Sequence, residues 1–302
     1  DGRTSPANFE AHRHALRQMR RTVVYLAAGY HLTEDARYAA RAADYLRGFF
    51  LDEATFMRPE VPYAQYITGE GFRKGTGIID TLHLIDVPLA VRHLEKSPHF
   101  PPELAAGLRE WFRRYFGWML SSQDGIEEML TENNHAICYF LQAAVWARFT
   151  ENPRLLDFCR ENFIRCCLPQ MAEDGSFPQE LKRSKPYGYS IFTLDNFVNL
   201  AWFISDDTQD FMRYKDARGC GVERGIDYLL PYLKDKSSRP YPPDVEHDDG
   251  WPARMPFMLL AASVFGRDDL AALYYSLPRE SEDMEVLRNT ASREVLLWLL
   301  PC

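Results

Sequence analysis

Two short polar segments contain the side chains best suited to acid–base chemistry, and the first of them is Thr131–His135. In this segment Asn134 and His135 stand directly before an apolar helical stretch. The start of a helix disfavours a protonated imidazole, so we expect His135 to stay neutral and able to accept a proton. Helix capping by Asn133 is the alternative interpretation, although one cap suffices and the second Asn and the His are then surplus.

The second segment runs from Gln179 to Ser190 and contains three cations and two tyrosines. Arg183 and Tyr189, six residues apart, are its candidates for chemistry. A solvated basic loop is the alternative interpretation. In a chain whose formal net charge is -8, however, such a loop is a natural place to hold a carboxylate.

A third, glycine-rich segment carries Arg73 and Lys74 between Gly71, Gly75 and Gly77. These glycines would let the backbone approach a ligand closely. The glycine spacing is not that of a phosphate-binding loop, and the sequence contains no nucleophile elbow, zinc-protease or dinucleotide-binding motif. The six Cys lack metal-ligand spacing, so we expect core thiols, no metal and no cofactor.

The composition is that of a protein with a large core and an acidic surface. Hydrophobic residues make up 46% of the 302 residues, and we expect one domain over residues 1–302. The 43 Asp and Glu against 35 Lys and Arg argue against a protein that binds nucleic acid or anionic membranes. No apolar run approaches the roughly 20 residues that cross a bilayer, so membrane insertion is not expected.

Apolar residues recur at three- and four-residue spacing along most of the chain, which predicts helices and few strands. The predicted helices cover 7–30, 34–50, 78–95, 102–122, 134–149, 153–168, 192–205, 220–234, 253–265, 268–276 and 283–299. Three stretches interrupt this pattern, at 56–77, 173–191 and 235–252. We expect functional residues there, because connecting segments on a rigid scaffold often carry function.

An internal repeat relates two of the predicted helix pairs. Leu32–Arg37 is similar to Phe149–Arg154, each between two amphipathic helices, and Phe265–Asp269 is a looser copy. Thr and Asp or Asn can cap the incoming helix, and Pro153 suits its first turn. Repeated helical hairpins bury their apolar faces only against neighbours, which predicts a solenoid or a closed α/α toroid.

The sequence resembles the alginate lyase type of domain found in polysaccharide lyase families 5 and 38, and family 38 more closely. Four segments carry the resemblance, namely YAQYITGEGFRKGTGIIDT (63–81), NNHAICYFLQ (133–142), LPQMAEDGSFPQELKRSKPYGYSIFTL (168–194) and WPARMPFMLLAASVFG (251–266). The resemblance implies an all-α fold, an incomplete (α/α)6-7 toroid of antiparallel helical hairpins with a long groove. It also implies a lyase that cleaves a β-1,4-linked uronic acid polymer by β-elimination.

The resemblance gives each candidate residue a role. Asn134 and Arg183 match positions that bind the uronate carboxylate, His135 matches the histidine of the same motif, and Tyr189 matches the catalytic tyrosine. The matching segments contain further residues that we expect to contact substrate, namely Gln65, Arg73, Lys74, Tyr139 and Tyr187. The implied partner is an anionic polysaccharide, mannuronate-rich alginate or glucuronan, met in an extracellular or periplasmic location, and no metal or cofactor is implied.

Two departures from the family pattern affect subsite details. The spacing from Arg183 to Tyr189 fits family 38 but is one residue shorter than in family 5, and Tyr187 stands where Trp is expected. Family members also carry an aromatic-rich segment before the Asp-Gly that opens this chain, so an N-terminal segment is expected to be missing. A non-catalytic uronate-binding toroid and an α/α-toroid glycoside hydrolase stay open as alternatives.

Elementary electrostatics explains why these residue types suit the reaction. The C5 proton of a uronate is hardly acidic while the neighbouring carboxylate is charged, so the charge must be neutralised by a cation or amide donor. Tyr, with a reference pKa of about 10, needs a nearby positive charge to act as a base. A charge about 4 Å away at an effective dielectric near 20 contributes on the order of 4 kcal/mol, so we expect Arg183 to lower the pKa of Tyr189.

Overall fold

The computed structural model describes residues 11–65, 75–279 and 281–290, and within these ranges it contains helices and no strand. The all-α prediction is therefore confirmed. The chain divides into two compact units. Unit 1 is made chiefly of Leu130–Ala144 and Arg154–Ala291, and unit 2 chiefly of Ser5–Met129 and Val145–Pro153. Each unit is described separately, and the single domain over 1–302 stays a prediction.

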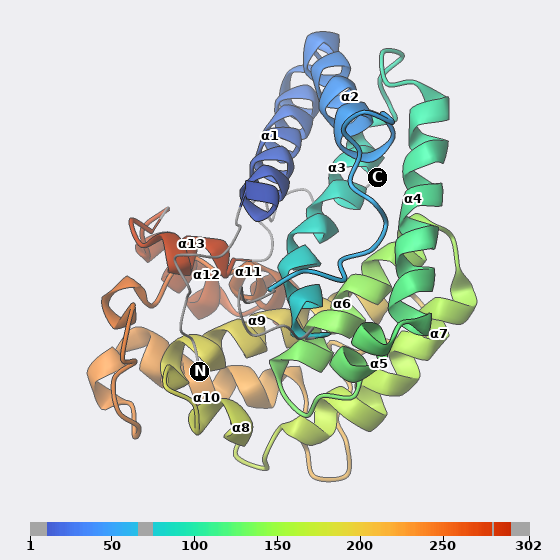
Figure 1. Cartoon of the computed structure of the whole chain (residues 1–302). Helices are drawn as coiled ribbons and strands as arrows, with labels where there is room; N and C mark the ends of the chain where they lie inside the picture. The colour runs from blue at the N-terminus through green and yellow to red at the C-terminus, as the bar shows by residue number, and fades with distance from the viewer. Residues whose placement is uncertain (1–10, 66–74, 280, 291–302) are drawn as a thin grey trace. The chain divides into compact units, whose positions relative to one another are not determined.

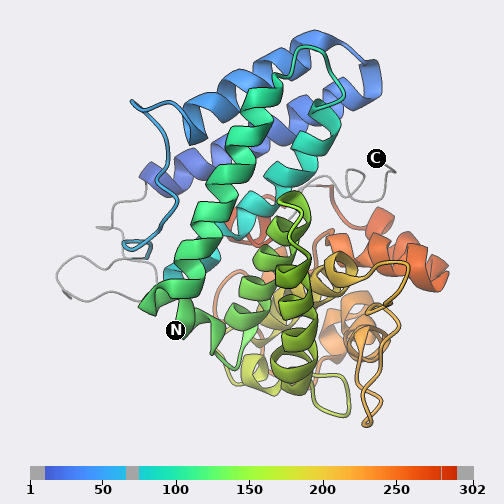
Figure 2. The ribbon, with the colours of Figure 1, turned by 90° about the vertical axis from the view of Figure 1, so that its right-hand side faces the viewer.

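Unit 2 is built around a hairpin of two long helices. Its elements are α1 (Ala11–Thr33), α2 (Ala36–Phe50), the 3-10 helix η1 (Gly75–Ile85), α3 (Asp86–Leu94), α4 (Pro102–Ser121) and α5 (Gln123–Met129). The hairpin of α1 and α2 contacts α3 through α1 and α4 through α2, as Figure 1 and Figure 2 show. Small residues on the buried face of α2, among them Ala39, Ala42 and Ala43, allow this close approach.

A buried ion pair joins α1 to the start of α3. The Arg20 guanidinium, only 3% exposed, donates to Asp86 Oδ2 at 2.9 Å and lies 3.1 Å from Nδ1 of His83. Such a pair contributes little net stability, but removing one partner leaves a buried charge uncompensated. The contact therefore fixes which part of α1 faces η1 and α3.

Unit 1 is a set of shorter helices around one central helix, α9. Its elements are α6 (Asn134–Phe149, whose last turn belongs to unit 2), α7 (Pro153–Asn162), the π-helix η2 (Phe163–Cys167), η3 (Leu168–Gln170), α8 (Pro178–Leu181), α9 (Pro186–Ile204), α10 (Val222–Lys234), η4 (Lys236–Ser238), η5 (Asp248–Gly250), α11 (Pro256–Phe265), α12 (Asp268–Ser276) and α13 (Met284–Arg288). Helix α9 contacts α8, α10, α11 and η2.

Helices α6 and α9 are buried on nearly every side. Residues 136–141 of α6 are 0% exposed, and most of α9 between Pro186 and Ile204 is buried. A helix that is hydrophobic all round belongs in a core, not at a surface. The starts of these two helices are therefore held on rigid supports, and both predicted polar segments lead into them.

From residue 11 onward the predicted helices agree with the structure, with three exceptions. The first half of the helix predicted over 78–95 is the 3-10 helix η1, and the other two differences lie around the second polar segment and at the C-terminal end. Helix α9 begins at Pro186 instead of at residue 192, because proline is well suited to the first helical turn. Tyr187 and Tyr189 thus lie in a helix, where the sequence predicted irregular structure. The short helices α5 and α8 were not predicted, and most of the helix predicted over 283–299 lies outside the described residues.

The joints of the internal repeat share one backbone conformation. Glu34 and Glu151 have φ values of 57° and 55°, and Gly266 in the looser copy has 65°. The hydroxyls of Thr33 and Thr150 each donate to a carbonyl four residues earlier, at 2.7 Å. The predicted helix-turn-helix joints are confirmed, and a left-handed residue ends the first helix of each.

Among the described cysteines, four are buried thiols and Cys166 is half-buried, with no disulfide between any of them. This agrees with the prediction of core thiols, and Cys302 lies outside the described residues. The part of the chain that the structure describes holds no helix long and apolar enough to cross a bilayer.

Substitutions of two glycines test whether a side chain at the left-handed position Gly266 lowers the stability. An added Cβ would meet nothing within 4 Å at either Gly266 or Gly117, but only Gly266 has a positive φ. We expect Gly266→Ala to lower the free energy of unfolding by about 1 kcal/mol. In contrast, Gly117→Ala, within α4, should raise it by about 0.5–1 kcal/mol. Urea denaturation measures both; equal effects of the two substitutions would contradict the assignment.

Asp195 is a fully buried acid in α9 that holds the start of α11. Its carboxylate accepts from the backbone N–H of Phe257 at 3.0 Å and from Nδ2 of Asn199 at 3.2 Å. Burial raises its pKa to about 7, against these hydrogen bonds. The unfolded chain therefore releases this proton near pH 4 while the folded chain keeps it until pH 7.

This difference predicts how stability changes with pH. Asp195 should reduce the free energy of unfolding by about 1.4 kcal/mol per pH unit as the pH rises from about 4 to about 7. Asp195→Asn removes this slope, because the amide does not titrate. Denaturant titrations at pH 5 and pH 7 compare the two proteins. If the free energy of unfolding changes equally between pH 5 and pH 7 in wild type and variant, the Asp195 carboxyl is ionised in the folded protein at both pH values, and the prediction is wrong.

Candidate active site

The four predicted catalytic residues lie in unit 1, at the starts of the two core helices. Asn134 and His135 are the first two residues of α6, Arg183 lies between α8 and α9, and Tyr189 is in the first turn of α9. Asn133 caps α6 by accepting the His135 backbone N–H at 3.0 Å on Oδ1. Capping thus accounts for Asn133, and neither Asn134 nor His135 is needed for it.

Asn134 is held by the carboxylate of Glu180, which comes from α8. The backbone N–H of Asn134 donates to Oε1 at 2.8 Å, and its side-chain Nδ2 donates to Oε2 at 2.9 Å. Both side chains are 1% exposed. A carboxylate at the start of α6 is also favoured by the helix dipole. The two hydrogen bonds fix the orientation of the Asn134 amide as well as the position of its backbone.

Arg183 connects the same carboxylate to the tyrosine. Its Nη1 donates to Oε2 of Glu180 at 3.4 Å, and its guanidinium carbon lies 3.5 Å from the centroid of the Tyr189 ring. A guanidinium stacked at this distance from an aromatic face is attracted by the ring quadrupole. Asn134, Arg183 and Tyr189 therefore form one continuous chain of contacts through Glu180, and His135 is adjacent to Asn134 along α6.

The surroundings of Tyr189 raise its pKa overall, although Arg183 lowers it as the sequence predicted. Burial is the main cause, and the charges of Glu285 and Glu180 add to it, whereas Arg183 and Arg288 act in the opposite direction. The sequence did not indicate the loss of solvent and the nearby carboxylates that outweigh the effect of Arg183. In this state Tyr189 is a phenol at neutral pH, suited to donate a proton.

A second buried carboxylate, Asp244, holds the start of α9. Its oxygens accept the backbone N–H groups of Tyr187 and Gly188, each at 2.8 Å. Gly188 is required at its position, because an added Cβ would lie 2.6 Å from Nε1 of Trp251 and 2.9 Å from Asp244. The loop that contains Asp244 therefore sets where Tyr189, one residue later, stands.

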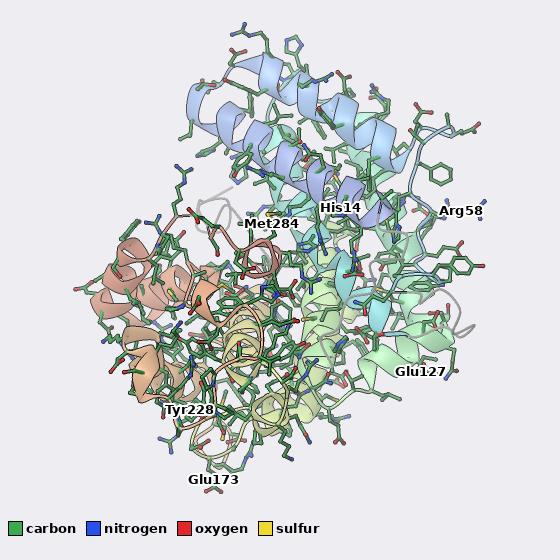
Figure 3. All side chains as sticks on the ribbon, turned by 60° about the vertical axis from the view of Figure 1, so that its left-hand side comes forward. His14, Arg58, Glu127, Glu173, Tyr228 and Met284 are labelled. Carbon is green, nitrogen blue, oxygen red and sulfur yellow. The ribbon has the colours of Figure 1, made fainter. Side chains whose placement is uncertain are left out.

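Charged residues of the C-terminal helix α13 also lie near Tyr189. Arg288 forms hydrogen bonds with Glu285, and Asp283 caps the helix by accepting the backbone N–H of Glu285 at 2.8 Å. His247 Nδ1 lies 2.8 Å from Oδ2 of Asp283 and so attaches the helix to the loop of Asp244. Figure 3 labels Met284, the first residue of α13. Both signs of charge thus surround the tyrosine.

The residues predicted to contact substrate fall into three groups. Gln65, in unit 2, is half-buried and has a left-handed backbone with φ 55°. Arg73 and Lys74 lie outside the described residues. Tyr139 and Tyr187 are 0% exposed, and the Tyr187 hydroxyl donates to the carbonyl of Tyr232 at 2.8 Å. The positions of these two rings are those of core residues, so we leave them out of the proposed substrate contacts.

Within the described ranges, no group of three or more His, Cys, Asp or Glu side chains is arranged to hold a metal ion. The donors of the site are instead an amide, a guanidinium, a phenol and an imidazole. This set can bind an anion and exchange protons.

Sequence reasoning missed Glu180 and Asp244, the two carboxylates that position the site. Glu180 is part of the second polar segment, where its three-residue spacing from Arg183 was a usable signal for an ion pair. Asp244 lies more than fifty residues from Gly188, and nothing in the local sequence marks it as the cap of α9. Only the folded chain brings it there.

Comparison with known families decides the relationship. The family model described as alginate lyase matches residues 1–239, well over half of the chain. The chain belongs to the alginate lyase family. As a member of this family it is a polysaccharide lyase. No curated protein matches this lyase.

Solved structures of alginate lyases share the fold of this lyase. An alginate lyase from Bacteroides ovatus is 27% identical with a TM-score of 0.82, covering 97% of this chain and 78% of its own. A histidine-to-alanine variant of the alginate lyase A1-III, complexed with a tetrasaccharide, is 14% identical with a TM-score of 0.65, covering 100% of this chain and 81% of its own. The predicted helical toroid class is confirmed by these neighbours.

The cap of α9 gives the lyase a testable dependence on Asp244. Asp244→Ala leaves two backbone N–H groups without their acceptor, so we expect a loss of about 2 kcal/mol in the free energy of unfolding. Activity should fall as well, because Tyr189 lies one residue beyond these groups. The matched control is Asp35→Ala, which removes an exposed cap of α2 that accepts the Arg37 N–H at 3.0 Å. The Asp35→Ala variant should lose less free energy of unfolding and keep the wild-type activity. Equal activity of the Asp244→Ala and Asp35→Ala variants would refute the role of Asp244.

Proposed function

We propose that this lyase cleaves a β-1,4-linked polymer of uronic acid, mannuronate-rich alginate or glucuronan, by β-elimination. The observation that carries the proposal is the stacking of Arg183 on Tyr189 at 3.5 Å, with Asn134 attached to the same carboxylate as Arg183. A cation, an amide donor and a proton-donating phenol are thus side by side. These are the groups needed to neutralise a uronate carboxylate and to protonate a leaving oxygen.

In the proposed reaction the polymer binds with a uronate carboxylate against Asn134 and Arg183. Neutralising this carboxylate stabilises the charge that develops when the C5–H bond breaks, and the proton goes to His135. In the alternative route, Tyr189 first releases its own proton to solvent, takes the C5 proton as the phenolate and returns it to O4. The C4–O4 bond then breaks with formation of a C4–C5 double bond, and Tyr189 supplies a proton to O4. The products are a new non-reducing end that carries the 4,5-unsaturated uronate and a free hydroxyl on the other fragment.

Two further parts of the proposal concern the partner and its location. The proposed partner is an anionic polysaccharide. Because the protein is acidic overall, such a polymer needs a local cation to bind, and Arg183 supplies one at the site. Large polyanions do not cross membranes unaided, so we propose that the protein meets its substrate in an extracellular or periplasmic location.

Incubation with poly-mannuronate, poly-guluronate and glucuronan tests the reaction class. A lyase produces ultraviolet absorbance from the unsaturated uronate in step with new reducing ends. Reducing ends without absorbance would indicate a hydrolase, and neither signal with retained binding would indicate a non-catalytic protein. Relative rates on the three polymers identify the preferred uronate.

Substitution of the proposed acid tests the mechanism. Tyr189→Phe should lower kcat by about 10²- to 10⁴-fold and leave polymer affinity nearly unchanged, because it removes only the transferable proton. The matched control is Tyr228→Phe in α10, labelled in Figure 3, which should keep the wild-type rate. A Tyr189→Phe enzyme with a near-normal rate would exclude Tyr189 as the acid.

The same assay assigns the base. If His135 takes the C5 proton, His135→Ala should lower kcat about as much as Tyr189→Phe. If Tyr189 both takes and returns the proton, the His135 variant should keep a much larger share of the wild-type rate on the same polymer.

A further inference from the structure

The carboxylate of Glu180 binds two of the proposed catalytic residues, Asn134 and Arg183. Among the described residues, its carboxylate contacts the backbone N–H and Nδ2 of Asn134 and Nη1 of Arg183. It is 1% exposed. A buried carboxylate with partners of this kind is not a solvated surface charge, and each of its contacts leads to a residue of the site.

The chemistry of a carboxylate fixes the direction of the Asn134 amide. An ionised carboxylate only accepts hydrogen bonds, so the amide must turn Nδ2 toward Glu180. The second N–H of Nδ2 is then the donor that remains for a substrate carboxylate. If the amide turned over, its carbonyl oxygen would replace that donor and repel an anion.

The charge of Glu180 acts on the other two residues. It pairs with the Arg183 guanidinium, which is stacked on Tyr189, and so offsets part of the positive charge beside the ring. A single side chain therefore acts on the amide, the guanidinium and the phenol.

We propose that Glu180 is a positioning residue of the elimination reaction, which orients the Asn134 amide and Arg183 as one unit. The inference rests on the proposed function, in which these three residues meet the substrate. Glu180 itself does not contact the reacting atoms. It acts through the residues that do.

The isosteric variant Glu180→Gln tests the proposal. One oxygen can still accept the Asn134 backbone N–H, but the new NH₂ group faces Nδ2 of Asn134, and the amide must turn over or move. We expect kcat/KM to fall about 100-fold, the size of loss that misplacement of a catalytic group produces. Because Glu180 acts partly through Asn134, the losses in the double variant Glu180→Gln/Asn134→Ala should be less than additive. Additive losses would overturn the proposal.

A pH titration separates positioning from simple destabilisation. Without the negative charge of Glu180, Tyr189 should lose its proton at a lower pH. NMR of ¹³Cζ-labelled tyrosine, with the Tyr189 signal identified through Tyr189→Phe, measures this titration without any activity. An unchanged titration in Glu180→Gln would refute the role proposed for its charge.

Asp195→Asn is the matched control, since Asp195 is also a buried carboxylate of unit 1 that accepts a backbone N–H at a helix start. It should leave kcat/KM and the Tyr189 titration near wild type, whatever its effect on stability. If it reproduced the Glu180→Gln losses, a general disturbance of the core would explain them. A wild-type protein that cleaves no uronate polymer would reject the proposed function, while the NMR titration would still decide the role of the Glu180 charge.

Discussion

The arrangement of the site depends on buried carboxylates that come from outside the helices they hold. Glu180 from α8 binds the start of α6, and Asp244 from a distant loop binds the start of α9. The unsatisfied N–H groups of a helix start need acceptors when they are buried, and an anion there also meets the positive end of the dipole. Two helix starts are thus neutralised by the protein itself, and among the described residues the Arg183 guanidinium stacks on the ring of Tyr189.

The state of Tyr189 follows from a competition between burial and charge. Burial and two carboxylates favour the neutral phenol, while Arg183 and Arg288 favour the phenolate. A uronate carboxylate that binds to Arg183 would add another negative charge near the ring and strengthen the preference for the phenol. The substrate itself would then help to keep the proton where the leaving oxygen needs it.

Local sequence patterns predicted the parts of the molecule that depend on local physics. The repeat of Leu32–Arg37 and Phe149–Arg154 indicated hairpin joints, and both joints have the same left-handed residue. The sequence predicted the start of α9 at the wrong residue. Its cap, Asp244, is distant in sequence, and because α9 is buried on nearly every side, its residues show no alternation between a polar and an apolar face. For the same reason the pKa of Tyr189 could not be predicted, since Glu285 reaches it only through the fold.

The burial of α9 on all sides has a consequence for how the enzyme moves. Backbone amides in a helix whose residues are nearly all buried exchange their hydrogens mainly when the surrounding unit opens, so we expect this helix to be among the slowest-exchanging parts of the protein. The tyrosine at its start therefore stands on a nearly immobile support. Any adjustment to the shape of a long sugar chain has to be made by segments outside this helix.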